Sequence, residues 1–156
     1  LHLKPELLSE VVGGAMQRLE KYGSTHHLRV EQEDDLLMAR IDARLILQVL
    51  TNLIDNAVKY TPPGSEIAVR TLRRDGMVVV EVADTGPGIP DADKEKVFEM
   101  FYTSAGSDAR RGMGLGLALC KSIVNAHGGT ISISDNVPHG AVFSFTLQEE
   151  RIDLPS

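Results

Sequence analysis

The sequence predicts a two-layer α/β sandwich, in which a mixed, mostly antiparallel sheet carries helices on one face. Two long segments, residues 43–60 and 114–127, have apolar residues at helical spacing. Much of the remaining chain consists of short runs rich in β-branched residues that end at glycine, proline or aspartate, as strands do. With 156 residues, 42% of them apolar and 24% charged, the composition is typical of one globular domain.

The first half of the chain is expected to form a helix, two strands, a second helix and a β-hairpin, over residues 6–21, 27–31, 36–40, 43–60, 66–72 and 77–83. Asp42 is the expected N-cap of the second helix. That helix should end at Thr61-Pro62-Pro63-Gly64, because proline cannot continue it. The hairpin is expected to turn at Asp75-Gly76.

The second half is expected to form a glycine-proline loop, a short helix, a polar stretch, a long helix and two strands, over residues 84–90, 93–99, 102–111, 114–127, 130–134 and 141–147. The long helix should end at Gly128-Gly129. We assign residues 1–150 to the single domain and expect a frayed tail after it, with fraying from as early as residue 148.

Charge and cysteine content exclude several classes of function. The net charge of −6 argues against nucleic acid as the main partner, because phosphate backbones require a basic surface. The single cysteine, Cys120, fits a reducing compartment and is expected to be a buried structural thiol. No apolar run is long enough to span a membrane, so we expect no membrane contact by this chain. Because the chain begins with Leu1, we expect it to be part of a longer protein.

The helix over 43–60 carries a polar stripe. Asn52, Asn56 and Lys59 fall at i, i+4 and i+7, with Asp55 beside them, so all four are expected to project to nearly one side. Asparagine is a poor helix former, which suggests a functional reason for two of them. An amide oxygen is a hard, neutral ligand that suits Mg²⁺ already bound to phosphates. The alternative is an ordinary solvated helix face.

The loop Asp84-Thr85-Gly86-Pro87-Gly88-Ile89 directly follows a predicted strand. Its glycines permit close approach of the backbone to a flat ring, and the carboxylate of Asp84 can accept a hydrogen bond from an amino group. These features suit an adenine pocket. A plain turn after a strand is the alternative.

A second glycine loop, Gly112-Met113-Gly114-Leu115-Gly116-Leu117, precedes the long helix over 114–127. Backbone N–H groups at a helix N-terminus can hold phosphates. The loop is neither the dinucleotide fingerprint nor a Walker A sequence, and it could instead be a flexible hinge. The adjacent Arg110 and Arg111 could neutralise a γ-phosphate or form a solvated basic pair.

Four segments occur in a specific order: NLIDNAVKY at 52–60, DTGPGIP at 84–90, VFEMFY at 97–102 and GMGLGLALCKSIVNAHGG at 112–129. Together they resemble the ATP-binding catalytic domain of sensor histidine kinases, in the GHKL superfamily that includes gyrase and MutL. The resemblance covers the core, residues 36–148, and implies a GHKL-type ATP-binding fold. The segment before the core and the stretch ILQVLTNLIDNAVKYTPPGSEI look like KdpD-type kinases, which sense potassium or turgor.

The resemblance implies a role for each matching residue. Asn56 would ligate Mg²⁺, Asn52 would lie near the phosphates of ATP, and Lys59 would contact them. Asp84 would bind the adenine amino group. Phe98 and Phe101 would anchor an ATP lid over residues 102–111. The remaining ATP-binding residues that the resemblance implies are Tyr60, Gly86, Gly88, Ile89, Phe101, Arg110, Arg111, Gly112, Gly114, Leu115 and Gly116.

The resemblance also implies what the chain does not do alone. Superfamily members that hydrolyse ATP carry a glutamate where this chain has Asn52, and an amide cannot act as a general base near neutral pH. No histidine has the context of a phosphoacceptor, and His127 is expected to cap a helix end. The acceptor would therefore lie in a separate dimerisation domain.

We therefore expect a monomeric cytoplasmic domain whose parent protein is anchored in the bacterial inner membrane and signals to a response regulator. A degenerate ATP-binding scaffold and a GHKL serine kinase of the anti-sigma type are the alternatives.

Overall fold

The computed structural model describes residues 1–99 and 113–151, and it contains a five-stranded sheet with the order β2-β4-β5-β7-β6. The strands are β2 (His27–Gln32), β4 (Glu66–Arg74), β5 (Met77–Asp84), β6 (Ile131–Asp135) and β7 (Ala141–Gln148). Strand β2 runs parallel to β4, and every other neighbouring pair is antiparallel. The predicted mixed, mostly antiparallel sheet is therefore confirmed.

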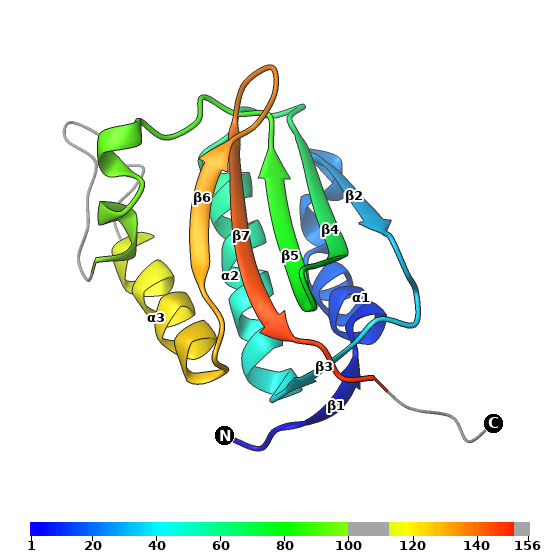
Figure 1. Cartoon of the computed structure of the whole chain (residues 1–156). Helices are drawn as coiled ribbons and strands as arrows, with labels where there is room; N and C mark the ends of the chain where they lie inside the picture. The colour runs from blue at the N-terminus through cyan, green and yellow to red at the C-terminus, as the bar shows by residue number, and fades with distance from the viewer. Residues whose placement is uncertain (100–112, 152–156) are drawn as a thin grey trace.

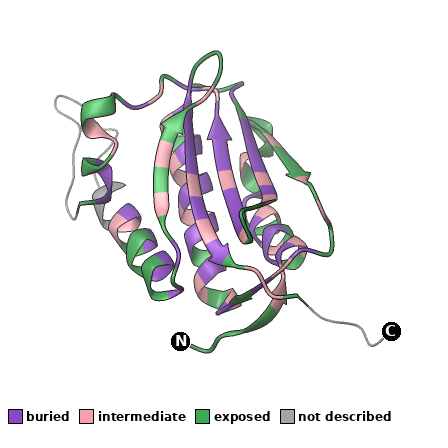
Figure 2. Ribbon diagram, in the orientation of Figure 1, coloured by how far each residue is buried: buried purple, intermediate pink, exposed green. Residues whose placement is uncertain are grey.

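Three helices cover one face of this sheet, as predicted (Figure 1). They are α1 (Leu8–Arg18), α2 (Ala43–Lys59) and α3 (Met113–Ala126). Alternate strand residues such as Val69, Val80 and Phe145 point into the core, where Leu50 and Leu53 of α2 are at most 1% exposed. Figure 2 shows this buried layer between the central strands and the helices. Its apolar burial is the main stabilising contribution to the fold.

A second, two-stranded sheet lies at the end of the molecule that carries the N-terminus. Strand β1 (Lys4–Leu7) pairs antiparallel with β3 (Met38–Ile41). The helix predicted over 6–21 is therefore wrong at both ends: it begins at Leu8, after β1, and a 3-10 helix over Glu20–Ser24 follows it. Strand β1 has no period-2 apolar pattern, because both Lys4 and Pro5 are exposed.

The residues directly after β7 are held by hydrogen bonds and are not frayed. Glu149 forms an isolated bridge with Ala39, and the Glu150 N–H donates to the Met38 carbonyl. The side chain of Glu149 is only 5% exposed and lies 2.6 Å from Arg73 of β4. The prediction of fraying from residue 148 is therefore wrong for residues 148–150. Residues 152–156 lie outside the described part of the chain.

The segment after the glycine-proline loop forms two short 3-10 helices, Asp91–Asp93 (η2) and Lys96–Phe98 (η3), instead of the helix predicted over 93–99. Only Val97 and Phe98 are buried there, so a longer helix would gain little packing to offset its nucleation cost. The polar stretch predicted over 102–111 lies outside the described residues. Within the described residues, no helix is both long and apolar enough to cross a membrane.

The start of α2 meets the end of α3. Asp42 occupies the N-cap position of α2 as predicted, but its side chain makes no capping hydrogen bond. Instead its Oδ2 accepts from the His2 N–H at 3.1 Å, and this bond is the main cause that holds the pKa of Asp42 below its usual range. The Asp42 N–H donates to Nε2 of His127 at 3.0 Å. His127 thus joins the two helices.

Candidate functional site

A pocket lies where the C-terminal ends of α2 and β5 meet the start of β7, at the upper end of the sheet in Figure 1. Its lining comes from three parts of the chain: Asn56, Ala57, Tyr60, Asp84, Pro87, Gly88, Ile89, Ala141 and Phe143. Five of these residues were predicted to bind nucleotide from the sequence: Asn56, Tyr60, Asp84, Gly88 and Ile89. The cavity volume is about 20 Å³, so a ring as large as adenine can enter only if the lining side chains move apart.

Asp84 is the last residue of β5 and is 5% exposed. Its Oδ1 accepts hydrogen bonds from the backbone N–H groups of Gly86 at 2.9 Å and of Ala141 at 3.2 Å. Its backbone carbonyl accepts from the Asn136 side-chain amide at 2.7 Å. These bonds fix the carboxylate at one wall of the pocket.

A side chain at Gly86 would crowd Thr61. A Cβ atom would lie 2.5 Å from Cγ2 of Thr61 and 3.2 Å from Oδ1 of Asp84. Thr61 cannot easily move away, because its hydroxyl donates to the Ala57 carbonyl at 2.7 Å and lies 2.9 Å from Nε2 of the buried His26. Thr61 and His26 thus hold the glycine loop in place. The sequence did not reveal this role.

The turn between β6 and β7 also supports the glycine loop. His139 Nδ1 lies 3.0 Å from the Gly86 carbonyl. A Cβ at Gly88, where φ is +78°, would lie 3.1 Å from the Gly140 carbonyl oxygen, and one at Gly140 would lie 1.9 Å from the Asp84 carbonyl oxygen. The sequence predicted strands over 130–134 and 141–147, but nothing local indicates which loop the turn between them contacts.

Asn56 faces the pocket with an unsatisfied amide. Its Nδ2 atom is buried and has no hydrogen-bond partner within the part of the chain that the structure describes. A buried amide without a partner is costly, so a ligand that supplies an acceptor would be stabilised there. Among the described residues, no group of three or more His, Cys, Asp or Glu is placed to hold a metal ion. A cation at this pocket would therefore depend on amide oxygens and on the ligand itself.

Asn52 lies one turn before Asn56 but faces α3. Its Nδ2 lies 3.9 Å from Sγ of Cys120, and that sulfur lies 3.8 Å from the Val49 carbonyl. Asn52 does not line the pocket. Cys120 is fully buried, and burial raises the pKa of its thiol to about 12. It is the buried thiol that the sequence predicted.

Lys59 and Asp55 turn toward another element. Lys59 Nζ lies 2.8 Å from Asp55 Oδ2, and the Tyr22 hydroxyl of η1 (Glu20–Ser24) donates to Asp55 Oδ1. Burial alone would raise the pKa of Asp55, but the hydrogen bonds from Lys59 and Tyr22 outweigh it and keep the pKa low. The Asp55 bond in turn raises the pKa of Lys59. The expected single polar stripe is therefore divided among three directions: Asn56 faces the pocket, Asn52 faces α3, and Asp55 with Lys59 faces η1.

The remaining predicted site residues belong to the lid and the second glycine loop. Phe101, Arg110, Arg111 and Gly112 lie outside the described residues. Gly114 and Leu115 fall in the first turn of α3, and a Cβ at Gly116 would meet nothing within 4 Å. Phe98 packs edge-on against Phe143 with ring centroids 6.4 Å apart. Because Phe143 lines the pocket, this contact holds η3 against the pocket wall.

Comparison with known proteins agrees with this geometry. The family described as histidine kinase-, DNA gyrase B- and HSP90-like ATPases matches residues 41–151. The chain is 44% identical over 147 residues to the sensor protein KdpD of Clostridium acetobutylicum, covering 93% of this chain and 16% of KdpD. It is 41% identical over 144 residues to the adaptive-response sensory kinase SasA of Nostoc sp., covering 90% of this chain and 35% of SasA. It thus spans well under half of either relative.

Among solved structures, the fold is similar to the catalytic domain of the histidine kinase ThkA. The TM-score is 0.84 at 28% identity, and the match covers 96% of this chain and 98% of the ThkA domain. ThkA has also been solved in complex with the response regulator protein TrrA. The chain belongs to the histidine kinase-, DNA gyrase B- and HSP90-like ATPase family, within which it is similar to the catalytic domains of sensor histidine kinases.

Proposed function

We propose that this domain binds ATP with Mg²⁺ and positions the γ-phosphoryl group for transfer to a histidine in a separate dimerisation domain. One observation carries the proposal. The pocket is lined by a fixed carboxylate, Asp84, and by a buried amide, Asn56, whose Nδ2 has no hydrogen-bond partner among the described residues. An amino-bearing ring and a polyphosphate are the two parts of one ligand that would satisfy both groups.

The adenine end of ATP would occupy the apolar part of the pocket once the lining side chains have moved apart. Ile89 and Phe143 are buried and supply apolar walls, and Tyr60 adds a half-buried ring. Asp84 would accept a hydrogen bond from the adenine amino group. Gly88 brings the backbone close to the ring without a side chain. Ligand pockets combine apolar walls with a few placed polar groups in this way.

The phosphate end would extend along α2 toward the second glycine loop. Asn56 would hold Mg²⁺ through its amide oxygen, together with oxygens of the phosphates. Lys59 and Asn52 would contact the phosphates, and the lid residues Arg110 and Arg111 would neutralise the γ-phosphate. When bound, Mg²⁺ would draw negative charge away from the transferred group.

The chemistry of the pocket supports transfer rather than hydrolysis. Among the described residues that line it, Asp84 is the one carboxylate, and its Oδ1 is occupied by two backbone N–H groups. Asn52 cannot take a proton from water. In the transfer, a histidine nitrogen would bond to the γ-phosphorus while the bond to the ADP oxygen breaks. We expect the isolated domain to hydrolyse ATP slowly.

The biological setting of the site is proposed from the relatives. The likeness to KdpD supports a role in potassium or turgor sensing within a membrane-anchored parent whose kinase domain is cytoplasmic. The ThkA–TrrA complex supports a response regulator as the downstream partner. Because dimerisation would come from another domain, we expect this chain to be monomeric. Sedimentation should give one species near 17.0 kDa, and a dimer at every concentration would contradict this.

Transfer of a labelled γ-phosphoryl group tests the proposal. The chain would be incubated with γ-labelled ATP and a separately produced dimerisation domain that carries a phosphoacceptor histidine. We expect an acid-labile, base-stable label on that domain and little free phosphate without it. An acid-stable label would indicate a serine kinase. ATP binding without any transfer would favour a non-catalytic scaffold.

A further inference from the structure

Lys59 already has a partner in this structure. Its Nζ lies 2.8 Å from Asp55 Oδ2, one helical turn earlier on α2. Asp55 is more than an exposed counter-ion, because its side chain is 31% exposed and its other oxygen accepts from the Tyr22 hydroxyl. Tyr22 belongs to η1, so the carboxylate is held between two elements. The side chain of Lys59 is 57% exposed, which leaves it able to move.

The same lysine is near the pocket. Lys59 follows Asn56 by three residues, and residues three apart are neighbours on a helix surface. A lysine ammonium is a compact charge on a flexible stem. It can therefore reach either the carboxylate of Asp55 or a phosphate held beside Asn56. Because Asp55 contacts η1 and Asn56 lines the pocket, movement toward one of them draws the ammonium away from the other.

We infer that Asp55, positioned by Tyr22, competes with the nucleotide phosphates for Lys59 and so sets the affinity of the pocket. This inference rests on the proposed function, because it requires a phosphate beside Asn56. Binding would require Lys59 to leave Asp55. Tyr22 makes that exchange easier, because Asp55 keeps the hydroxyl bond when the ammonium departs. Lys21, whose Nζ lies 5.2 Å from the Tyr22 ring centroid, is the other cation at this cluster.

A double-mutant cycle tests the competition. ATP affinity would be measured by calorimetry for the unchanged chain, Asp55→Asn, Lys59→Ala and the double variant. Asp55→Asn should tighten ATP binding about two- to fivefold, the factor that a partly exposed ion pair is worth. In the Lys59→Ala background, Asp55→Asn should change nothing. An equal gain in both backgrounds would overturn the inference, because it would be a general charge effect.

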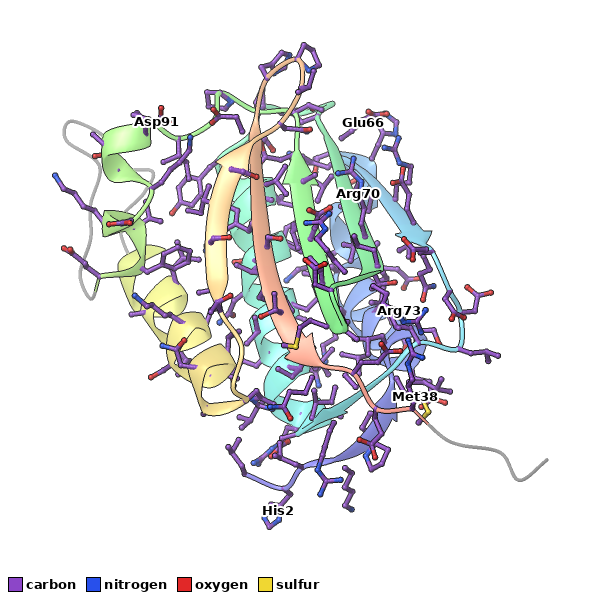
Figure 3. The ribbon with its side chains drawn as sticks, in the orientation of Figure 1. His2, Met38, Glu66, Arg70, Arg73 and Asp91 are labelled. Atoms are coloured by element: carbon purple, nitrogen blue, oxygen red, sulfur yellow. The ribbon has the colours of Figure 1, made fainter. Side chains whose placement is uncertain are left out.

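Asp91→Asn is the matched control. Asp91 is also an exposed carboxylate paired with a lysine, Lys94, and it lies on η2 away from α1 and η1 (Figure 3). Removing its charge should leave ATP affinity unchanged. A gain as large as that of Asp55→Asn would contradict competition for Lys59. Thermal unfolding of each variant would check that the fold is retained.

Tyr22→Phe tests the positioning role. Without the hydroxyl, Asp55 depends more on Lys59, so ATP affinity should fall about twofold, and this loss should disappear in the Asp55→Asn background. A loss that persists there would mean that Tyr22 acts only through packing, which would contradict its positioning role.

If the unchanged chain bound no ATP, the proposed function would fail. If it bound ATP and Asp55→Asn left the affinity unchanged or lower, only this inference would fail.

Discussion

At the scale of single residues, Gly86 shows that a position beside the pocket requires a residue without a side chain. Its Cβ would lie 2.5 Å from Cγ2 of Thr61, whose rotamer is fixed by hydrogen bonds to Ala57 and His26. Gly86→Ala should therefore lower the free energy of unfolding by about 1–3 kcal/mol, the usual cost of overpacking. It should also weaken nucleotide binding, because a backbone shift that relieves the clash would displace the residue-86 N–H that donates to Asp84 Oδ1. Urea unfolding and calorimetry would measure the two effects.

Two further variants separate crowding from other effects of the new methyl group. In Gly86→Ala/Thr61→Ser the Cγ2 atom is gone, so most of the lost stability should return. Gly13→Ala is the matched control, because nothing lies within 4 Å of its Cβ in α1 and alanine favours helix by about 0.5–1 kcal/mol. If Gly13→Ala destabilised as much as Gly86→Ala, crowding at Thr61 would not be the cause.

Cys120 gives a second prediction at this scale. Burial raises the pKa of its thiol to about 12, so the reactive thiolate is scarce throughout the neutral range. The folded chain should react with a thiol reagent at pH 8 far more slowly than the chain in urea. Absorbance of the released reagent group measures both rates. Equal rates would mean that Cys120 is accessible, contrary to its complete burial.

The sequence predicted the pocket residues that share a local motif and missed those that support them. Asp84, Gly88 and Ile89 lie in one short loop, so their joint role could be inferred from residue types alone. Asn136 and His139 contact that loop from more than fifty residues away in the sequence. Without a contact map, such residues look like ordinary turn residues.

At the scale of elements, His127 joins the two helices that carry the proposed site. Because Nε2 accepts from the Asp42 N–H, Nδ1 carries the ring proton and donates to the Ile123 carbonyl at 2.8 Å. His127→Ala leaves the buried Asp42 N–H without a partner, which costs about 1–3 kcal/mol of unfolding free energy. Urea unfolding would measure the loss.

His2→Ala is the control for that variant. It keeps the backbone N–H that donates to Asp42 and removes only an exposed ring, so stability should change by less than about 0.5 kcal/mol. A loss from His127→Ala no larger than that of the control would contradict the linking role. The predicted role of His127 as a helix cap is thus confirmed. Its ring also holds the start of α2.

Long elements with a clear period were predictable, and short ones were not. Helix α2 was predicted as 43–60 and ends at Lys59, because its apolar face and the following prolines define it. Strand β1 was missed, because its pairing with β3 depends on a partner more than thirty residues away. The helix expected over 93–99 became two 3-10 helices, because tertiary packing buries only Val97 and Phe98 there.

At the scale of the whole molecule, the end of β7 is tied to β4 by Arg73 and Glu149 (Figure 3 labels Arg73). The hydrogen bond from Arg73 is the main cause that holds the pKa of Glu149 below its usual range. A lowered pKa in the folded state stabilises the protein above the ordinary glutamate value of about 4.3. This contribution is lost as the pH falls through the lower, folded-state pKa.

Glu149→Gln should therefore be less stable than the unchanged chain at pH 6, and the difference should shrink below about pH 4.3. Urea unfolding across this pH range would measure it. A Glu149→Gln deficit that stayed constant to low pH would indicate lost packing rather than a lost ion pair.

The central claim is that the pocket between α2, the loop after β5, and β7 binds ATP. Calorimetric titration of the chain with ATP and Mg²⁺, repeated with Asp84→Asn, tests it most directly. We predict saturable one-to-one binding that Asp84→Asn weakens about tenfold or more, as expected when a hydrogen bond to a charged group is lost. No binding at millimolar ATP, or equal binding by Asp84→Asn, would contradict the account.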